Sequence, residues 1–323
     1  MVVTIGPRTS ISELYGSEVT PEKSDGTQKH DLMCARMFLN FFGRARRAET
    51  LSRRDWARGR AVPQESRRPV RDRTIAADLI WLKLVLTWGT KWQDREGRHL
   101  LTENPVRGYE LPRERNPRRP VATQDRYERL LQAAEGVQME VRWDGKRRSQ
   151  RSYLKELLVL ANGTGRRLSA ICQLRFEDLH LGMGPYGSIR WRADTDKTGR
   201  ETVVPIGPYV RSAIDQIMRE RPGLGSAPLL PSPNDPQKPI SRHLARTWLR
   251  KAERVADLEP QQGSLWHAFR RKWATERKHL PDVDVAAAGG WKELHSLKTA
   301  YQQADQETML RVILDAGELR EVR

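Results

Sequence analysis

Three prolines stand within nine residues of this chain, at positions 112, 117 and 120, in the segment PRERNPRRP. Proline lacks the backbone N–H that helices and strands require, so no regular element can continue through this stretch. Clustered prolines stiffen a chain toward an extended conformation, and four arginines against one glutamate make the segment basic. A chain of 323 residues is long enough for two domains. We therefore predict a linker at residues 112–122 between two separately folded parts.

Before the linker, apolar residues recur with a helical period. One predicted helix spans residues 31–42, and a second spans residues 74–94 with one apolar stripe of Ile75, Leu79, Leu82 and Leu86. We therefore predict a helical domain over residues 29–111. Residues 1–28 show no sustained period, and we expect a mobile N-terminal arm with one short helix near Ser10–Tyr15.

After the linker, helical patterns predominate. One predicted helix spans Thr123–Glu135, a basic loop covers residues 146–151, and a helix over Ser152–Ala161 ends at Asn162-Gly163. Residues 187–206 alternate apolar and polar side chains around a turn-forming segment, which predicts β-structure. Further helices are predicted at residues 208–220, 241–256, 264–278, 282–288, 292–303 and 305–316. The fold class expected is mainly α, with a small antiparallel β-sheet in the second domain, residues 123–323.

The chain carries a large excess of positive charge. Lys and Arg total 58 against 41 Asp and Glu, a formal net charge of +17. Such an excess favours a polyanionic partner, with nucleic acid the first candidate and an acidic membrane surface the second. Residues 44–73 hold eleven arginines against four acids; this run is either a solvated surface or a contact with the DNA backbone. The predicted DNA contacts are Arg44, Arg46, Arg47, Arg53, Arg54, Arg67, Arg68, Arg71, Arg118, Arg119, Arg147 and Arg148.

Composition argues against several other classes of protein. No apolar run approaches the ~20 residues of a membrane span, and the first residues lack the pattern of a secretory signal. Cys34 and Cys172 are too few for a disulfide framework or a zinc cluster. We expect a cytoplasmic, nucleoid-associated protein that is not secreted.

Short motifs in the second domain carry chemically competent side chains. They are Thr164-Gly165-Arg166-Arg167, Lys197 in a turn-forming segment, His267-x-x-Arg270, and Gly290-Trp291 followed by Tyr301. Each motif is weak evidence alone, because the H-x-x-R spacing only places two polar groups on one helix face, and a lone Tyr is usually packing. Arg166 is interpreted as a phosphate contact or a surface charge. The information lies in the order and separation of the motifs.

In this order the motifs resemble the tyrosine recombinase (phage integrase) family across residues 123–323. The resemblance implies a two-domain DNA clamp, with a helical core-binding domain and an α+β catalytic domain around double-stranded DNA. It also implies a homo-tetramer on paired DNA sites, no metal or other cofactor, and DNA-bending accessory proteins as further candidate partners. The final helix, near residues 304–316, resembles a helix that docks onto a neighbouring protomer, and docking within its own protomer is the alternative.

The resemblance assigns the covalent step to Tyr301, which would attack a DNA phosphodiester and hold the strand as a 3′-phosphotyrosine. A phenol titrates near pH 10, so the site must help to remove its proton. His267 is the candidate for that role. Lys197 would protonate the departing 5′ oxygen.

The same resemblance assigns the phosphate oxygens to Arg167 and Arg270, whose planar guanidinium groups bind oxyanions in a bidentate manner. Trp291 would add an indole N–H and a packing wall. Two positions depart from the family pattern. Ala170 stands where an acid is common, and the tyrosine follows Trp291 by ten residues, one more than the commonest spacing. A shift of register would place His295 in the site.

The implied function is site-specific cleavage and rejoining of DNA strands, for integration, excision or resolution of a DNA element. Two alternatives stay open. A type IB topoisomerase-like enzyme uses nearly the same residues, but the small helical domain before the linker favours a recombinase. A non-catalytic DNA-binding protein on the same scaffold is favoured by Ala170 and by the longer spacing.

Overall fold

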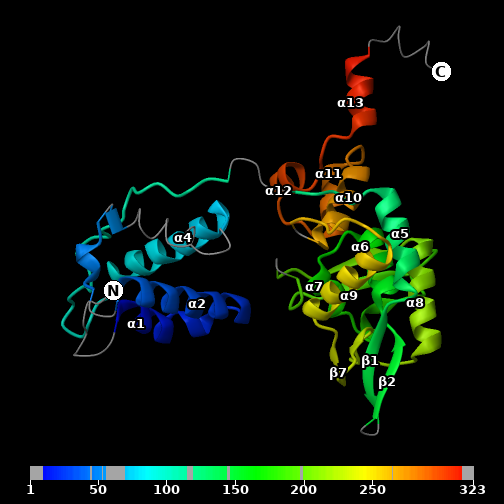
Figure 1. Ribbon diagram of the computed structural model, residues 1–323, viewed down its shortest axis with the longest axis horizontal. Coiled ribbons are helices and arrows are strands. Elements are labelled where there is room, and N and C mark those ends of the chain that lie inside the picture. Colours follow the sequence, from blue (N-terminus) through cyan, green and yellow to red (C-terminus); the bar gives the residue numbers. More distant parts are fainter. Residues whose placement is uncertain are drawn as a thin grey trace. The chain divides into compact units, whose positions relative to one another are not determined.

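The structure is a computed structural model that describes residues 10–43, 46–52, 54–55, 70–114, 119–143, 146–196, 199–263 and 265–314, without the side chains of residues 142, 143, 147, 306 and 307. The chain divides into two compact units, Met1–Pro117 and Arg118–Arg323. This division falls inside the proline-rich segment that the sequence marks as a linker. In Figure 1 the first unit is coloured blue to cyan and the second green to red.

The first unit is helical. The core of this unit is formed by side chains of helices that contact one another. Trp81 is part of this core and stacks on Phe38, with ring centroids 6.0 Å apart. The carboxylate of Asp31, although buried, is satisfied by hydrogen bonds from Thr20, Lys23 and the Trp81 indole. The elements are α1 (Ile11–Glu18), α2 (Asp25–Phe42) and α4 (Asp72–Gly89), with 3₁₀ turns at Thr20–Glu22 and Ala48–Thr50.

The prediction of a mobile arm is wrong for the part that the structure describes. Ser10 accepts a hydrogen bond from the backbone N–H of Glu13, and the Glu13 side chain bonds the Ser10 N–H in return, a capping box that starts α1. Ile11 and Tyr15 are buried in the core of the first unit. Residues 10–28 therefore belong to the folded unit, while residues 1–9 lie outside the described residues.

The second unit confirms the predicted fold class, since it is mainly helical with small antiparallel sheets. One sheet contains β3, β4 and β5, with β4 central, and two further pairs are β1–β2 and β6–β7. The strands are β1 (Gln138–Trp143), β2 (Lys146–Arg151), β3 (Leu179–His180), β4 (Ser188–Trp191), β5 (Thr202–Pro205), β6 (Pro231–Ser232) and β7 (Asp235–Pro239). The helices are α5 (Gln124–Ala134), α6 (Leu154–Thr164), α7 (Leu168–Cys172), α8 (Pro208–Glu220), α9 (Arg242–Val255), α10 (His267–Glu276), α11 (Asp282–Gly289), α12 (Leu294–Ala300) and α13 (Gln306–Ile313).

The predicted basic loop at residues 146–151 is a strand. It pairs along its whole length with β1, from Gln138 opposite Arg151 to Trp143 opposite Lys146. The sequence does hold the signal, because Met139 and Val141 alternate with polar residues ahead of an Asp-Gly dipeptide, a common hairpin signature. High charge led to the wrong prediction.

Helix α6 forms the centre of the second unit. Leu154, Leu157, Leu158 and Leu160 are all fully buried, and α8 and α10 pack against the helix. The helix continues past the predicted end at Asn162-Gly163 and is capped by Gly165, which has a left-handed φ of +62°. A Cβ atom on Gly165 would lie 2.4 Å from the Trp273 ring. The end of α6 therefore requires glycine for two reasons, its conformation and its close contact.

No helix in the described part of the chain is both long enough and apolar enough to cross a membrane.

Replacing Gly165 by alanine should destabilise the protein by about 3 kcal/mol, the sum of left-handed strain and overpacking against Trp273. Gly184 is the matched control, because its φ of +68° is equally left-handed but a Cβ atom there would meet no neighbouring atom within 4 Å. Gly184→Ala should cost only about 1 kcal/mol. Urea unfolding followed by tryptophan fluorescence measures both. Equal losses in the two variants would remove the Trp273 contact from the explanation.

Candidate active site

The site is organised by helix α10, which begins at His267 and carries Arg270 one turn later on the same face. Arg270 is only 2% exposed. Its Nη1 group donates to the carbonyl oxygens of Gly165 and Gly289, at the ends of α6 and α11. Its Nε and Nη2 atoms are buried and have no acceptor in hydrogen-bonding geometry among the described residues. Apart from an interaction with the Tyr301 phenol, which raises the pKa of Arg270, these donors are engaged by no acceptor among the described residues.

Two aromatic rings cover this guanidinium. The Arg270 Cζ atom lies 3.5 Å from the ring centroid of Trp291 and 5.1 Å from that of Tyr301. The two rings meet edge to face, with centroids 4.9 Å apart, and the His267 ring lies 6.2 Å from Tyr301. The indole Nε1 of Trp291 is also buried without a partner in the part of the chain described. The structure therefore brings together four of the predicted catalytic residues.

Arg167, the fifth, caps the start of α7. Its Nη1 donates to Asp196 Oδ1 at 3.2 Å and to the carbonyl of Gly290 at 3.3 Å. Burial and, after it, the positive charge of Arg167 lower the pKa of Arg270, while the Tyr301 phenol acts in the opposite direction, and together these effects bring that pKa to about 9. Arg270 remains charged at neutral pH, so a concentrated positive charge faces the tyrosine.

The segment that carries Tyr301 is anchored through its backbone. Tyr301 follows the last residue of α12, and its carbonyl accepts from the Thr275 hydroxyl of α10 at 3.2 Å. Arg271 donates to the carbonyl of Ala300, and Arg119 donates to that of Thr299. Sequence reasoning missed Arg271, and it predicted Arg119 only as a DNA contact. Both lie in arginine-rich stretches, where a positioning arginine cannot be distinguished from a surface one.

The longer spacing between Trp291 and Tyr301 does not separate the two rings. Residues 290–293 connect α11 to the short helix α12, and the tyrosine lies just beyond the last turn of that helix. His295 is exposed, whereas Trp291 is buried against Arg270. Trp291, and not His295, therefore lies in the site.

Several predicted residues lie outside the described residues. Lys197 is one of them, although its neighbour Asp196 contacts Arg167. Arg46 pairs with Asp55 at 2.7 Å, which uses part of its hydrogen-bonding capacity within the protein. Arg47, Arg54, Arg71 and Arg148 are exposed. The predicted DNA contacts Arg44, Arg53, Arg67, Arg68, Arg118 and the side chain of Arg147 also lie outside the described residues.

The interpretation of Arg166 as a phosphate contact or surface charge is wrong. The side chain is buried, at 3% exposure, and its donors are taken up by protein acceptors, among them Asp196 and the carbonyl groups of Ala287 and Ala288. No local sequence signal distinguishes it from the adjacent Arg167. The acceptors of its side-chain hydrogen bonds lie 30 to 122 residues away in the chain.

Among the described residues, His30, Cys34 and Asp78 of the first unit form a group that resembles a set of metal ligands, with ligand atoms within 4.8 Å of one another. The Cys34 thiol donates to Asp78 at 3.5 Å. Burial, with Asp78 beside it, raises the pKa of this thiol to about 12. Because a metal takes the thiolate, we interpret the group as a hydrogen-bonded pair within the helical core.

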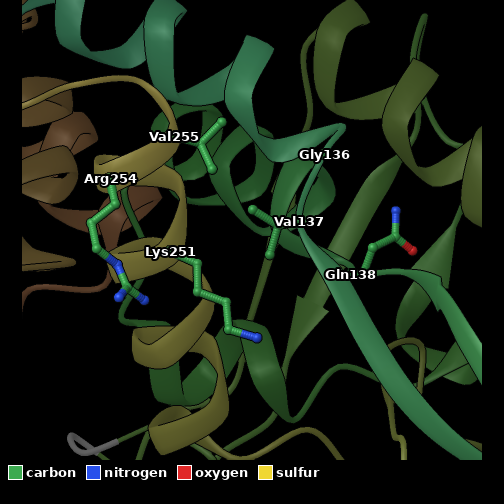
Figure 2. Close-up of a pocket in the computed structure, with 6 residues that line it drawn as sticks. All are labelled: Gly136, Val137, Gln138, Lys251, Arg254 and Val255. Atoms are coloured by element: carbon green, nitrogen blue, oxygen red, sulfur yellow. The ribbon is translucent and has the colours of Figure 1, made fainter.

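A groove lies where β1 begins and α9 ends (Figure 2). It contains none of the predicted catalytic residues. Two of its lining side chains are basic, and the backbone at Gly136 forms part of its wall. The lining residues are Gly136, Val137, Gln138, Lys251, Arg254 and Val255.

Arg270 and Trp291 pack on the Tyr301 ring, and Arg167 lies near Arg270, so the site concentrates positive charge and N–H donors that suit the binding of an oxyanion. The chain carries the sequence pattern of a known protein family. The sequence model of the phage integrase family matches residues 120–308, and the chain belongs to this family of tyrosine recombinases. The predicted function, site-specific recombination by DNA cleavage and rejoining, is confirmed at this level. Among curated proteins, none matches the chain by sequence.

Solved structures share the fold at low sequence identity. A lambda integrase dimer bound to a COC′ core site matches with a TM-score of 0.69 and 16% identity, covering 92% of this chain and 79% of that one. XerH recombinase in a post-cleavage complex with palindromic difH matches with a TM-score of 0.70 and 16% identity, covering 94% of this chain and 84% of that one. The Tn1549 transposon integrase in complex with circular intermediate DNA matches with a TM-score of 0.66 and 14% identity, covering 94% of this chain and 99% of that one.

Replacing Trp291 by phenylalanine should keep the aromatic wall over Arg270 and remove one N–H donor. Strand cleavage should slow by about 10²-fold, the usual effect of removing one transition-state donor. Stability should barely change, because the indole N–H has no partner among the described residues. Trp273→Phe is the contrasting control. The Trp273 N–H donates to the carbonyl of Gly163, so removing this donor should lower the free energy of unfolding by about 1 kcal/mol and change the cleavage rate little. Cleavage by Trp291→Phe at the wild-type rate would exclude a role for this donor.

Proposed function

We propose that this chain cuts and rejoins double-stranded DNA at a specific site, with Tyr301 forming a 3′-phosphotyrosine. One observation carries the proposal: the buried Nε and Nη2 of Arg270 and Nε1 of Trp291 have no acceptor among the described residues and lie beside the Tyr301 ring. Burying a donor without a partner costs about 1–3 kcal/mol, and more when the group is charged. The non-bridging oxygens of a phosphodiester would supply the acceptors.

The proposed reaction is an exchange of one phosphoester bond for another. The Tyr301 oxygen attacks phosphorus, the bond from phosphorus to the 5′ oxygen breaks, and His267 assists removal of the phenol proton. Lys197 gives a proton to the departing 5′ oxygen. Arg167, Arg270 and Trp291 stabilise the charge that develops on the phosphate oxygens. Attack by a free 5′ hydroxyl on the phosphotyrosine reverses these steps and restores an intact strand.

We also propose double-stranded DNA as the partner of both units, with the first unit, including residues 10–28, as the core-binding domain and residues 112–122 as the linker. A structure of lambda integrase shows a tetramer bound to a Holliday junction, and XerH is bound to its difH substrate. By analogy we propose a homo-tetramer on paired sites, in the nucleoid. Helix α13 supports an assembly role, since Met309, Leu310, Val312 and Ile313 are all exposed apolar residues.

Tyr301→Phe should abolish the covalent step and leave DNA binding intact. The assay uses nicked duplexes that carry candidate attachment sequences from the DNA flanking the gene, and looks for a denaturant-resistant protein–DNA adduct. The wild-type protein should form the adduct and the variant should form none. An adduct that persists in the variant would assign the nucleophile to another residue. A wild-type protein that binds its site without forming an adduct would favour the non-catalytic alternative, and plasmid relaxation without site preference the topoisomerase-like one.

Changing the exposed apolar face of α13 should weaken assembly on DNA. Val312 and Ile313 are 79% and 78% exposed, so Val312→Glu with Ile313→Glu should leave the fold intact. We expect single-site binding to persist and complexes of two or more protomers to be lost in gel-shift titrations. Removing residues 304 onward should have the same effect. Val283→Glu is a control at another exposed apolar position, 66% exposed on α11. Assembly unchanged in the α13 variant would contradict docking in trans.

A further inference from the structure

Arg166 connects three segments of the catalytic unit from a buried position. Its Nε donates to the carbonyl of Ala288 at 2.9 Å, and its Nη2 donates to that of Ala287 at 3.1 Å, both near the end of α11. The same Nη2 bonds the Thr202 hydroxyl of β5 at 2.9 Å. Its guanidinium also lies over the Trp191 ring of β4, 5.0 Å from the centroid. These contacts leave Arg166 no role on the protein surface.

The remaining nitrogen of Arg166 meets a carboxylate that is shared with the active site. Asp196 accepts from Arg166 Nη1 through Oδ2 at 3.4 Å and from Arg167 Nη1 through Oδ1 at 3.2 Å. Its side chain is only 6% exposed. Asp196 lies in the turn between β4 and β5, where its N–H donates to the carbonyl of Arg192. One carboxylate therefore joins a structural arginine to a predicted catalytic one.

The fit around this pair is tight. Gly290, next to Trp291, has a φ of +74°, and a Cβ atom there would come within 2.4 Å of Arg166 Nη1 and 3.2 Å of Asp196 Oδ2. Arg167 also donates to the carbonyl of Gly290. Arg166 and Arg167 are adjacent cations, so without the carboxylate between them they would repel each other in a site that is largely out of water. Asp196 offsets this repulsion and fixes one guanidinium nitrogen of Arg167.

We propose that Asp196, held in place by Arg166, is a positioning residue that orients the guanidinium of Arg167 toward the scissile phosphate. This inference rests on the proposed function, because it concerns the same phosphate-binding group. Asp196 itself touches neither DNA nor the nucleophile in this role. Its loss should therefore slow the cleavage step and leave the affinity for DNA nearly unchanged.

The test compares two aspartates of the same turn. Asp196→Asn should slow adduct formation by about 10²-fold, the usual effect of a misplaced reacting group, with DNA affinity within about twofold. Asp196→Glu should recover part of the rate, because it restores a carboxylate. Asp194→Asn is the matched control: Asp194 pairs with Arg192 at 3.3 Å but is 66% exposed, and this variant should cleave at the wild-type rate.

A second comparison separates positioning from general damage to the fold. Asp196→Asn leaves Arg166 buried beside Arg167 without its counterion, and this variant can lose stability. The double variant Arg166→Gln with Asp196→Asn removes both buried charges and should show the same slow cleavage. In an Arg167→Gln background, Asp196→Asn should cause no further loss, because the residue through which it acts is gone. Suicide substrates that accumulate the adduct allow these slow rates to be measured.

The outcomes separate this inference from the proposed function. Wild-type adduct with unchanged rates in Asp196→Asn would overturn the positioning role alone. The positioning role would also be overturned if the Asp196→Asn change slowed adduct formation by the same factor in the Arg167→Gln background as in the wild-type protein. Two independent effects add in free energy, so their rate factors multiply. A wild-type protein that forms no adduct would overturn the proposed function instead.

Discussion

The catalytic unit depends on one buried charge, the guanidinium of Arg270. Its Nη1 group donates to the carbonyls of Gly165 and Gly289, where α6 and α11 end. Carbonyls at a helix C-terminus have no intrahelical partner and carry partial negative charge, so they offset part of the cost of burying a cation. Both helices can end here because Gly165 and Gly290 adopt left-handed conformations. The position of the site is therefore set by where two helices stop.

Helix α10 carries the predicted phosphate-binding residue Arg270 and contacts the segment that bears the predicted nucleophile, Tyr301. One of its faces carries His267 and Arg270, whose donors and ring lie toward Tyr301. The same helix supplies Arg271 and Thr275, which hold the backbone at residues 300 and 301. Because α10 packs against α6 in the core, these groups share one rigid support. Arg270 and the backbone at Tyr301 are therefore both held by side chains or backbone of one helix.

Features that depend on residues close together in the chain, such as motif order and helix starts, could be predicted from the sequence. Side chains with distinctive chemistry, such as His267, Arg270 and Tyr301, stand in a recognisable order, and the helix predicted to start at Thr123 does start there, with Thr123 as its N-cap. Partners distant in sequence decided the rest. Arg166 resembles a surface charge until Asp196 and the end of α11 surround it, and Ser10–Glu18 resembles an arm until α4 covers it. Strand β2 was missed for a different reason, because its high charge was taken to indicate a loop although the sequence carries a local hairpin signal.

The proposed role of Asp196 would also account for Ala170, which stands where an acid is common in the family. Ala170 is buried in the apolar core of the second unit, where a carboxylate would have to be desolvated. Asp196 brings a carboxylate to Arg167 from a different element, the turn between β4 and β5. Arg166 and Arg167 share this carboxylate, and the nearby guanidinium of Arg270 adds a third positive charge. In the proposed mechanism a second acid would cancel more of the positive charge, whereas the single carboxylate of Asp196 would orient Arg167 and leave a net positive charge for the phosphate.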